Sequence, residues 1–215
     1  LFFVLSGFLI CYTVLRKREN NPDYDFWEFF LDRFFRIFTP LVPALLLVLV
    51  LDYIAMRFGS DYGYEEYFTA KDFVGNLLML SQHPFGLVAD QLLNLEALKI
   101  STFGSARPHW TVIIEWWIYL FFGWAVLRAK LLEREPLKFL LVLTIFSIVP
   151  LFNVVAGTGE GLTIIWFAAA LAAWGWYKEE SRFGRAVSTF RSGPTAPILA
   201  PWTAGLILVL LVARV

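Results

Sequence analysis

Glu115 is the residue whose position most directly suggests chemistry, because it is an acid inside the apolar stretch 109–127. A helix needs roughly 20 mostly apolar residues to cross a bilayer, and this stretch is close to that length. A carboxylate at membrane depth costs on the order of 3 kcal/mol on insertion scales, and crossing the bilayer does not require one. We therefore predict a functional acid at this position. The structural alternative is a protonated or paired acid that helps helices to pack.

The spacing around Glu115 predicts one polar face on this helix. Four residues recur every four positions and so share that face: Thr111, Glu115, Tyr119 and Gly123. We expect the face to look into protein or a wet cavity, with Tyr119 bonded to Glu115 or to a substrate. A tyrosine that only packs is the alternative. The other face is expected to meet lipid through Val112, Ile113, Trp116, Trp117 and Phe121.

Two arginines form the second candidate site. Within 24–38, polar residues three and four positions apart make one stripe among aromatic side chains: Asp25, Glu28, Asp32 and Arg36. This pattern predicts an amphipathic helix in the membrane interface. Arg33 lies toward the apolar side, where it must snorkel or bind a ligand. Both arginines could hold phosphate by charge-assisted hydrogen bonds. Alternatively, they only mark the cytoplasmic side of the membrane and contact lipid headgroups.

The composition predicts an all-α, polytopic transmembrane helical bundle. The chain has 215 residues, of which 59% are hydrophobic and 18% aromatic, and its mean hydropathy is +0.65. A soluble domain is nearer half apolar. Long apolar runs between short charged loops are typical of membrane helices, and the alternating strands of a transmembrane barrel are not found. We expect membrane lipid as a partner and no nucleic acid.

The apolar runs predict several spans, near 1–15, 40–58, 109–127, 137–155 and 162–177, with a last one from about residue 196. Pro40 and Pro43 are expected to open the second span, because proline is tolerated in a first helical turn. Pro150 is expected to kink a later span, and Asp52 to be an interfacial residue. The stretch 73–107 is interpreted as a loop with a short re-entrant or interfacial helix, or alternatively as two short crossings.

Basic residues mark the segments 16–38, 128–138 and 178–191 as one side of the membrane. These segments hold thirteen of the Lys and Arg residues, against five elsewhere, and the positive-inside rule assigns them to the cytoplasm. We expect a multi-pass protein of a bacterial inner membrane. No internal repeat is found, which counts against an inverted-repeat transporter.

The ends of the chain and its rarer side chains add further expectations. Residue 1 is Leu and both ends lie in apolar runs, so we expect 1–215 to be part of one transmembrane domain, truncated at both ends. The first run lacks the basic leader and cleavage site of a signal peptide. Cys11 is interpreted as a packing residue. Without a Cys/His cluster, we expect no metal site and no bound cofactor.

The two histidines are interpreted as peripheral residues. His109 lies six residues before Glu115, about 9 Å of helical rise, which is too far for direct contact. We expect His109 to be an interfacial residue near the acceptor of any transferred group. His83 precedes Pro84 and is expected to lie in a loop.

Three motifs, in this order, resemble the membrane acyltransferase 3 family, which comprises O-acyltransferases that modify sugars and other hydroxyl acceptors. Residues 2–10, FFVLSGFLI, are similar to the family's FFVLSGFL signature. Residues 33–37, RFFRI, with Pro40 resemble its Arg-x-x-Arg-Ile segment followed by proline, although the proline comes one residue late. Residues 110–119 resemble its W-[ST]-L-x-x-E-x-x-x-Y stretch. The resemblance extends to about residue 125, and later spans match only in general character.

The resemblance implies roles for the candidate residues. The donor would be an acyl-CoA, used as a substrate, whose phosphates Arg36 and Arg33 would bind. The family's proposed catalytic histidine lies on the helix before FFVLSGFL, and it is therefore expected upstream of Leu1. Glu115 would orient that histidine, as a carboxylate orients imidazole in a triad, or would bind the acceptor. Ser6, beside Gly7, is adequately explained by close helix packing.

We therefore predict an integral membrane O-acyltransferase. It would move an acyl group, expected to be acetyl, from cytoplasmic acyl-CoA to a hydroxyl of a glycan or lipid-linked sugar. The alternative is a membrane transporter or flippase with Glu115 as a proton or substrate site. A third interpretation is a structural bundle or inactive relative that binds a partner.

Overall fold

The computed structural model consists of helices and connecting loops in the part of the chain that it describes, with no strand there. That part comprises residues 1–59, 62–81, 83–86, 99–157, 159 and 161–191, without the side chains of 182–191. The longer helices are α1 (Phe2–Asn20), α2 (Phe26–Phe58), α3 (Ala70–Leu77), α5 (His109–Leu127), α7 (Pro136–Ala156) and α8 (Leu162–Arg191). The short ones are η1 (Glu65–Tyr67) and α6 (Leu131–Arg134). The predicted all-α class is confirmed, whereas the span expected from residue 196 lies outside the described residues.

Three helices in the described part are long and apolar enough to cross a membrane. They are α2, α5 and α7, at positions where the sequence predicts spans, and they confirm a membrane bundle. The spans expected near 1–15 and 162–177 are also helical, but α1 and α8 continue well past them into charged turns. Lys17 and Arg18 in the last turn of α1 complement the negative end of the helix dipole.

Helix α2 corrects one expectation, because the predicted interfacial helix and the following span are one element. The Asp25 carboxylate caps its start by accepting hydrogen bonds from the backbone N–H groups of Trp27 (2.9 Å) and Glu28 (3.1 Å). The prediction that Pro40 and Pro43 lie in a first helical turn is wrong, because both lie inside the helix. Each proline removes one hydrogen bond, but membrane helices tolerate this where neighbours and local adjustment satisfy the freed groups.

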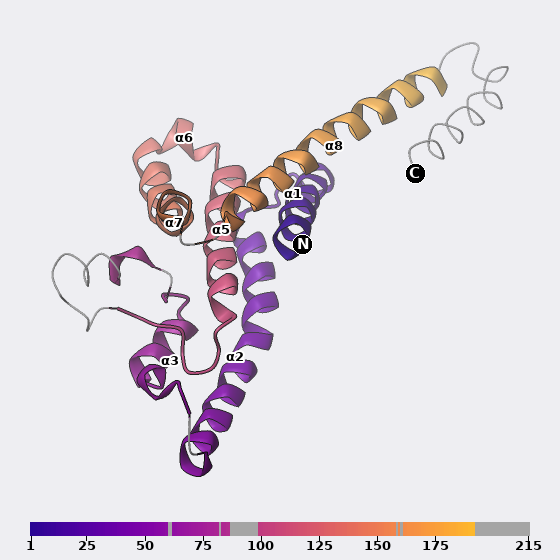
Figure 1. Cartoon of the computed structure of the whole chain (residues 1–215). Coiled ribbons are helices and arrows are strands. Elements are labelled where there is room, and N and C mark those ends of the chain that lie inside the picture. Colours follow the sequence, from indigo (N-terminus) through magenta and orange to yellow (C-terminus); the bar gives the residue numbers. More distant parts are fainter. Residues whose placement is uncertain (60–61, 82, 87–98, 158, 160, 192–215) are drawn as a thin grey trace.

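Helix α5 lies at the centre of the described bundle (Figure 1). One side packs with α1 and α8 in a core that includes Ile114, Ile118 and the buried Cys11. The other side packs with α2 and α7 in a second core that includes Ile113 and Trp116. The prediction of a lipid-facing side was therefore wrong, since every residue assigned to it is buried or half-buried. A helix that is apolar all round is suited to an interior position.

The segment between α2 and α5 is held by buried acids. Asp52 accepts hydrogen bonds from the Ser105 backbone N–H and hydroxyl, both at 2.8 Å, so it is a buried anchor for this segment, and its place at the membrane interface stays a prediction. Asp72 accepts from the Ser101 backbone N–H at 2.7 Å and from the Thr69 hydroxyl at 2.5 Å. A short helix was expected within 73–107, and the structure has α3, which begins earlier, at Ala70. Residues 87–98 of the predicted loop lie outside the described part.

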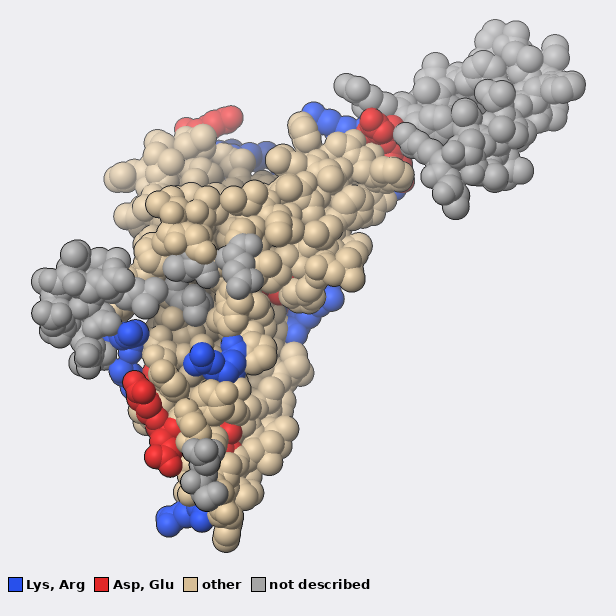
Figure 2. All heavy atoms as spheres, viewed as in Figure 1, with Lys and Arg blue, Asp and Glu red and all other residues tan. Residues whose placement is uncertain are grey.

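The predicted basic segments meet at one end of the bundle. Arg128 pairs with Asp25 at 3.0 Å, Lys17 pairs with Asp32, and Arg16 pairs with Glu180 at 2.5 Å. The first two contacts join the residue after α5 and the end of α1 to the first part of α2, and the third joins α1 to α8. Away from such charged clusters, the visible surface of the described residues is mostly uncharged (Figure 2). The side of the membrane that this end faces stays a prediction.

Candidate functional site

The predicted polar face of α5 opens onto a cavity between α1, α2 and α5. Its volume is about 920 Å³, within the usual size of small-molecule sites. One side of α2 lines it from Arg33 to Val48, a helical rise of about 22 Å. On α5, its lining runs from His109 through Glu115 to Tyr119. The cavity thus contains every candidate site residue that the sequence singles out.

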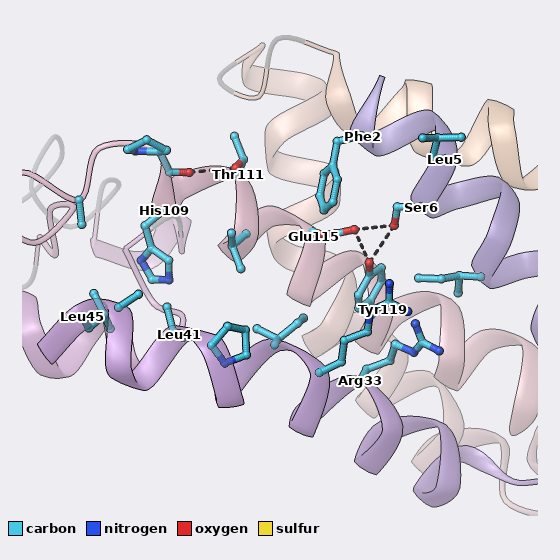
Figure 3. A pocket seen from close by; sticks show the side chains of 18 of the residues that line it. Phe2, Leu5, Ser6, Arg33, Leu41, Leu45, His109, Thr111, Glu115 and Tyr119 are labelled. Atoms are coloured by element: carbon cyan, nitrogen blue, oxygen red, sulfur yellow. Dashed lines mark hydrogen bonds between the residues drawn. The ribbon is translucent and has the colours of Figure 1, made fainter. Parts of the chain in front are cut away.

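Glu115 is held by two hydroxyl groups on the same carboxylate oxygen. Ser6 Oγ donates a hydrogen bond to Glu115 Oε1 at 2.5 Å, and the Tyr119 hydroxyl donates to the same atom. The two hydroxyl oxygens lie 2.8 Å apart, so the three side chains form a triangle (Figure 3). Oε2 has no hydrogen-bond partner among the described residues. The triangle therefore fixes the carboxylate and leaves one oxygen for another molecule or another part of the protein.

The close approach of α1 to α8 places Ser6 in this triangle. A Cβ atom at Gly7 would clash with the backbone oxygen of Trp166 and lie 3.2 Å from the Ala169 side chain. Glycine lets the two helices touch at this point, and Trp166 Nε1 then donates to Ser6 Oγ at 3.0 Å. Trp166 is completely buried. Close packing of Ser6-Gly7 was predicted, but it is also the means by which Ser6 reaches Glu115.

Arg33 and Arg36 line the same cavity from α2. Arg33 lies beside Tyr119 and below the Glu115 triangle in Figure 3. Its guanidinium carbon is 5.8 Å from the centre of the Phe29 ring, a cation–π distance. Its Nε atom is buried and has no hydrogen-bond partner among the described residues, whereas Arg36 is an exposed residue. This end of the cavity is therefore cationic and has an unpaired N–H donor.

His109 corrects another expectation, because it is buried in the protein rather than peripheral. Only 7% of its surface is exposed, and its Nδ1 atom lies 3.0 Å from Asn76 Oδ1. His83 lies outside the cavity lining. Its Nδ1 accepts a hydrogen bond from the Phe85 backbone N–H at 3.3 Å, and burial lowers the pKa of its imidazole. The sequence did not reveal the burial of His109, because α3 and the segment before α5 create it.

The structure thus joins residues from three predicted motifs in one place. Glu115, Tyr119, Arg33 and Arg36 line one cavity, and Ser6, which was assigned to packing, bonds directly to Glu115. Trp166 was missed altogether, because nothing in its local sequence distinguishes it from other aromatic residues of its helix. The only sequence signal for the contact between Ser6 and Glu115 was the FFVLSGFLI motif that contains Ser6.

Comparison with known proteins identifies the family of the chain. The family profile described as an acyltransferase domain, that of the acyltransferase 3 family, matches residues 1–214. The match extends well beyond the first 125 residues, where the sequence motifs are found. No curated protein and no solved structure matches the chain. Because the profile covers nearly the whole chain, the protein belongs to the acyltransferase 3 family of membrane acyltransferases.

Proposed function

We propose that this chain forms the substrate-binding core of an O-acyltransferase in the membrane. The acyl group, most simply acetyl, would come from acyl-CoA and be transferred to a hydroxyl of a glycan or lipid-linked sugar. The observation that carries the proposal is the single cavity that holds the Glu115 triangle and both arginines. Family membership supports the reaction type, and the residues of the cavity support the choice of substrates.

The cationic end of the cavity supports an acyl-CoA donor. Phosphate groups are bound well by guanidinium groups, which offer several N–H donors in a planar fork. Arg33 has a buried Nε without a partner among the described residues, and an anion would satisfy it. Arg36 is exposed and can bind a phosphate that approaches from outside the protein. A donor bound here would carry its thioester toward the Glu115 triangle.

The reaction requires a proton acceptor close to Glu115. The acceptor hydroxyl attacks the thioester carbonyl, a C–O bond forms, the C–S bond breaks, and the hydroxyl proton leaves to a base and then to the departing thiolate. General bases contribute roughly 10²–10⁴ in rate. We expect the base to be a histidine upstream of Leu1, with the Oε2 atom of Glu115 orienting its imidazole or binding the acceptor. Ser6 and Tyr119 would keep Glu115 in position.

The gathering of basic side chains at one end supports a cytoplasmic donor. Arg16, Lys17 and Arg128 lie at that end with the start of α2, and basic residues beside membrane spans favour the cytoplasmic side. Cells hold acyl-CoA in the cytoplasm, so the arginine end of the cavity would face the donor pool. We propose a bacterial inner membrane as the location, with membrane lipid around the exposed apolar helices.

The proposal is tested by acyl transfer in the full-length protein. Cells without the gene are complemented with the wild type, Glu115→Gln or Arg36→Ala, and the esters on envelope glycans are measured by mass spectrometry. Arg57→Ala is the matched control, since Arg57 is an exposed arginine on the same helix outside the cavity. We expect ester loss in both site variants and none in the control. Unchanged esters in both well-inserted site variants, or in cells without the gene, would favour the transporter or flippase alternative.

A further inference from the structure

The end of the cavity opposite the arginines has its own unpaired polar group. His109 is 7% exposed, and its Nε2 atom is buried with no hydrogen-bond partner among the described residues. His109 lines the cavity, and in Figure 3 its ring points toward Leu41 and Leu45 of α2. A buried polar atom without a partner costs on the order of 1–3 kcal/mol. Such an atom in the wall of a cavity is a candidate contact for a ligand.

The surrounding hydrogen bonds fix which nitrogen of His109 carries the proton. The Asn76 side chain donates from Nδ2 to the backbone oxygens of Asp72 and Ser101, both at 2.7 Å. Carbonyl oxygens only accept, so the amide nitrogen must face them and Oδ1 must face His109. Oδ1 also only accepts, and therefore Nδ1 of His109 is the donor across the 3.0 Å contact. In the neutral imidazole, Nε2 is left as an acceptor with a free lone pair.

The pocket around Nε2 favours a neutral ligand with both a hydroxyl and an apolar face. Apolar residues of this end include Leu41, Leu45 and Ala106. The cations of the cavity lining are Arg33 and Arg36, and Leu45 is nine residues, or about 13 Å of helix, beyond Arg36. An anion would be repelled by the lone pair, and the cationic residues that line the cavity lie toward its other end. A sugar offers hydroxyl donors on a ring whose C–H groups can pack against leucine.

We infer that Nε2 of His109 accepts a hydrogen bond from a hydroxyl of the acceptor and so positions the acceptor at the end of the cavity opposite the acyl donor. The assignment deepens the proposed function and rests on it. The acceptor class is a neutral, hydroxyl-bearing ring such as a pyranose. His109 and Glu115 are six residues apart on α5, about 9 Å of rise, and this is the length along the helix that the acceptor would span to reach the acid.

Two substitutions in the full-length protein distinguish the role of Nδ1 of His109 from the role of Nε2. In His109→Asn the side-chain amide can still donate to Asn76 but places no acceptor at the Nε2 position. In His109→Gln the longer side chain can return an oxygen toward that position. His83→Asn is the matched control, because it changes a histidine outside the cavity lining. We expect His109→Asn to raise KM for the acceptor roughly tenfold, in keeping with one lost hydrogen bond. The KM for acyl-CoA should not change, His109→Gln should recover part of the loss, and the control should match the wild type.

A second experiment tests the hydrogen bond to Nε2 of His109 without measuring acyl transfer. The purified protein is labelled with ¹⁵N-histidine, and the His109 signals are assigned from their loss in His109→Asn. We expect the Nδ1–H tautomer, and a saturable shift of the Nε2 signal on addition of methyl glycosides of glucose, galactose or mannose. Tetrahydropyran, the same ring without hydroxyls, should cause no such shift.

The outcomes separate this inference from the proposed function. The opposite tautomer, or an Nε2 signal that no glycoside shifts, overturns the assignment and leaves a histidine that meets only water. An acceptor KM that is unchanged in His109→Asn also overturns it, even if the enzyme transfers acyl groups normally. If the wild type transfers no acyl group but the glycosides still shift Nε2, the proposed reaction fails while the hydroxyl site stands.

Discussion

Helices α5 and α2 line the same cavity but are held in the molecule in different ways. Of the most apolar stretch of each helix, 56% is buried in α5 and only 11% in α2. Along α2, side chains such as Leu47 and Val50 are more than half exposed and in a membrane would meet lipid or another helix. Glu115 thus sits on a helix enclosed by two cores, whereas the arginines sit on a helix with an open flank.

The difference suggests a division of tasks between the two helices. A group that orients the reactants must be kept close to its productive geometry, and the two cores packed against α5 do this for Glu115. A binding group for a charged donor must instead be reachable, and the exposed Arg36 on α2 meets that need. Substitutions of Glu115 and the residues bonded to it should therefore affect turnover, and substitutions of the arginines should affect donor binding. The variants below test this separation, beginning with the largest expected effect.

Glu115→Gln should produce the largest loss. The amide oxygen of glutamine can still accept from Ser6 and Tyr119, so the triangle and the fold should persist, but the charge and the second carboxylate oxygen are lost. We expect kcat to fall roughly 10²–10⁴-fold, the range for a group that supports acid–base chemistry, with little change in the melting temperature. Radiolabelled acyl transfer in membranes measures the rate. Glu133→Gln, at an exposed acid on α6, should have no effect, and near-normal turnover in Glu115→Gln would leave the acid with a packing role only.

Arg36→Ala should act mainly on the donor. A hydrogen bond to a charged group is worth about 1.5–3 kcal/mol, so KM for acyl-CoA should rise roughly tenfold to a hundredfold while kcat changes less. Arg36→Lys should lie between, since lysine keeps the charge but not the planar fork. Steady-state kinetics at varied acyl-CoA concentration separate the two constants. Arg57→Ala on the same helix should leave KM unchanged, and an equal fall in kcat for Arg36→Ala would break the proposed division between the helices.

Ser6→Ala should cause a smaller, roughly tenfold fall in kcat, because one hydrogen bond to Glu115 is lost while that from Tyr119 remains. The Trp166 N–H also loses its acceptor, so the melting temperature should fall slightly. Ser147→Ala is a matched control, since the Ser147 hydroxyl is buried on α7 and donates to the Thr144 backbone oxygen at 2.8 Å, outside the cavity lining. Complete loss of activity, together with an acyl group trapped on Ser6 in the wild type, would instead identify Ser6 as a covalent nucleophile.

The sequence predicted the parts of the site that depend on one helix. Glu115 and Tyr119 share a face because of helical periodicity alone, and Arg33 and Arg36 stood out by their charge in an aromatic segment. The contact of Ser6 with Glu115 joins residues 109 positions apart, and it requires α8 to bring Trp166 against α1. Helical periodicity carries no information about such a contact.

The errors have the same physical origin. Prolines at positions 40 and 43 suit a helix start as well as a helix interior, and the choice depends on whether the surroundings satisfy the freed backbone groups. The apolar side of α5 suits lipid as well as protein, and the packing of α2 and α7 decides between them. His109 appeared peripheral because it begins its helix, yet Asn76 and the segment before α5 enclose it. Each error arose because helical periodicity does not predict which other elements pack against a residue.

The contact between the two helices provides the last and smallest test, which concerns stability. At Gly123 of α5, an added Cβ atom would lie 2.5 Å from the ring of Phe29 on α2. Gly123→Ala should therefore push the helices apart, at a cost of roughly 1–3 kcal/mol for overpacking. The melting temperature in detergent should fall by several degrees.

Gly175→Ala is the matched substitution for this test, because a Cβ atom at Gly175 of α8 meets open space. Alanine is the better helix former by about 1 kcal/mol, so this variant should be as stable as the wild type or more so. If Gly123→Ala melts like Gly175→Ala, α2 is not packed closely against α5 and the two helices are free to move apart. If it melts lower and also raises KM for acyl-CoA with kcat unchanged, the buried helix sets the position of the arginines on the exposed one.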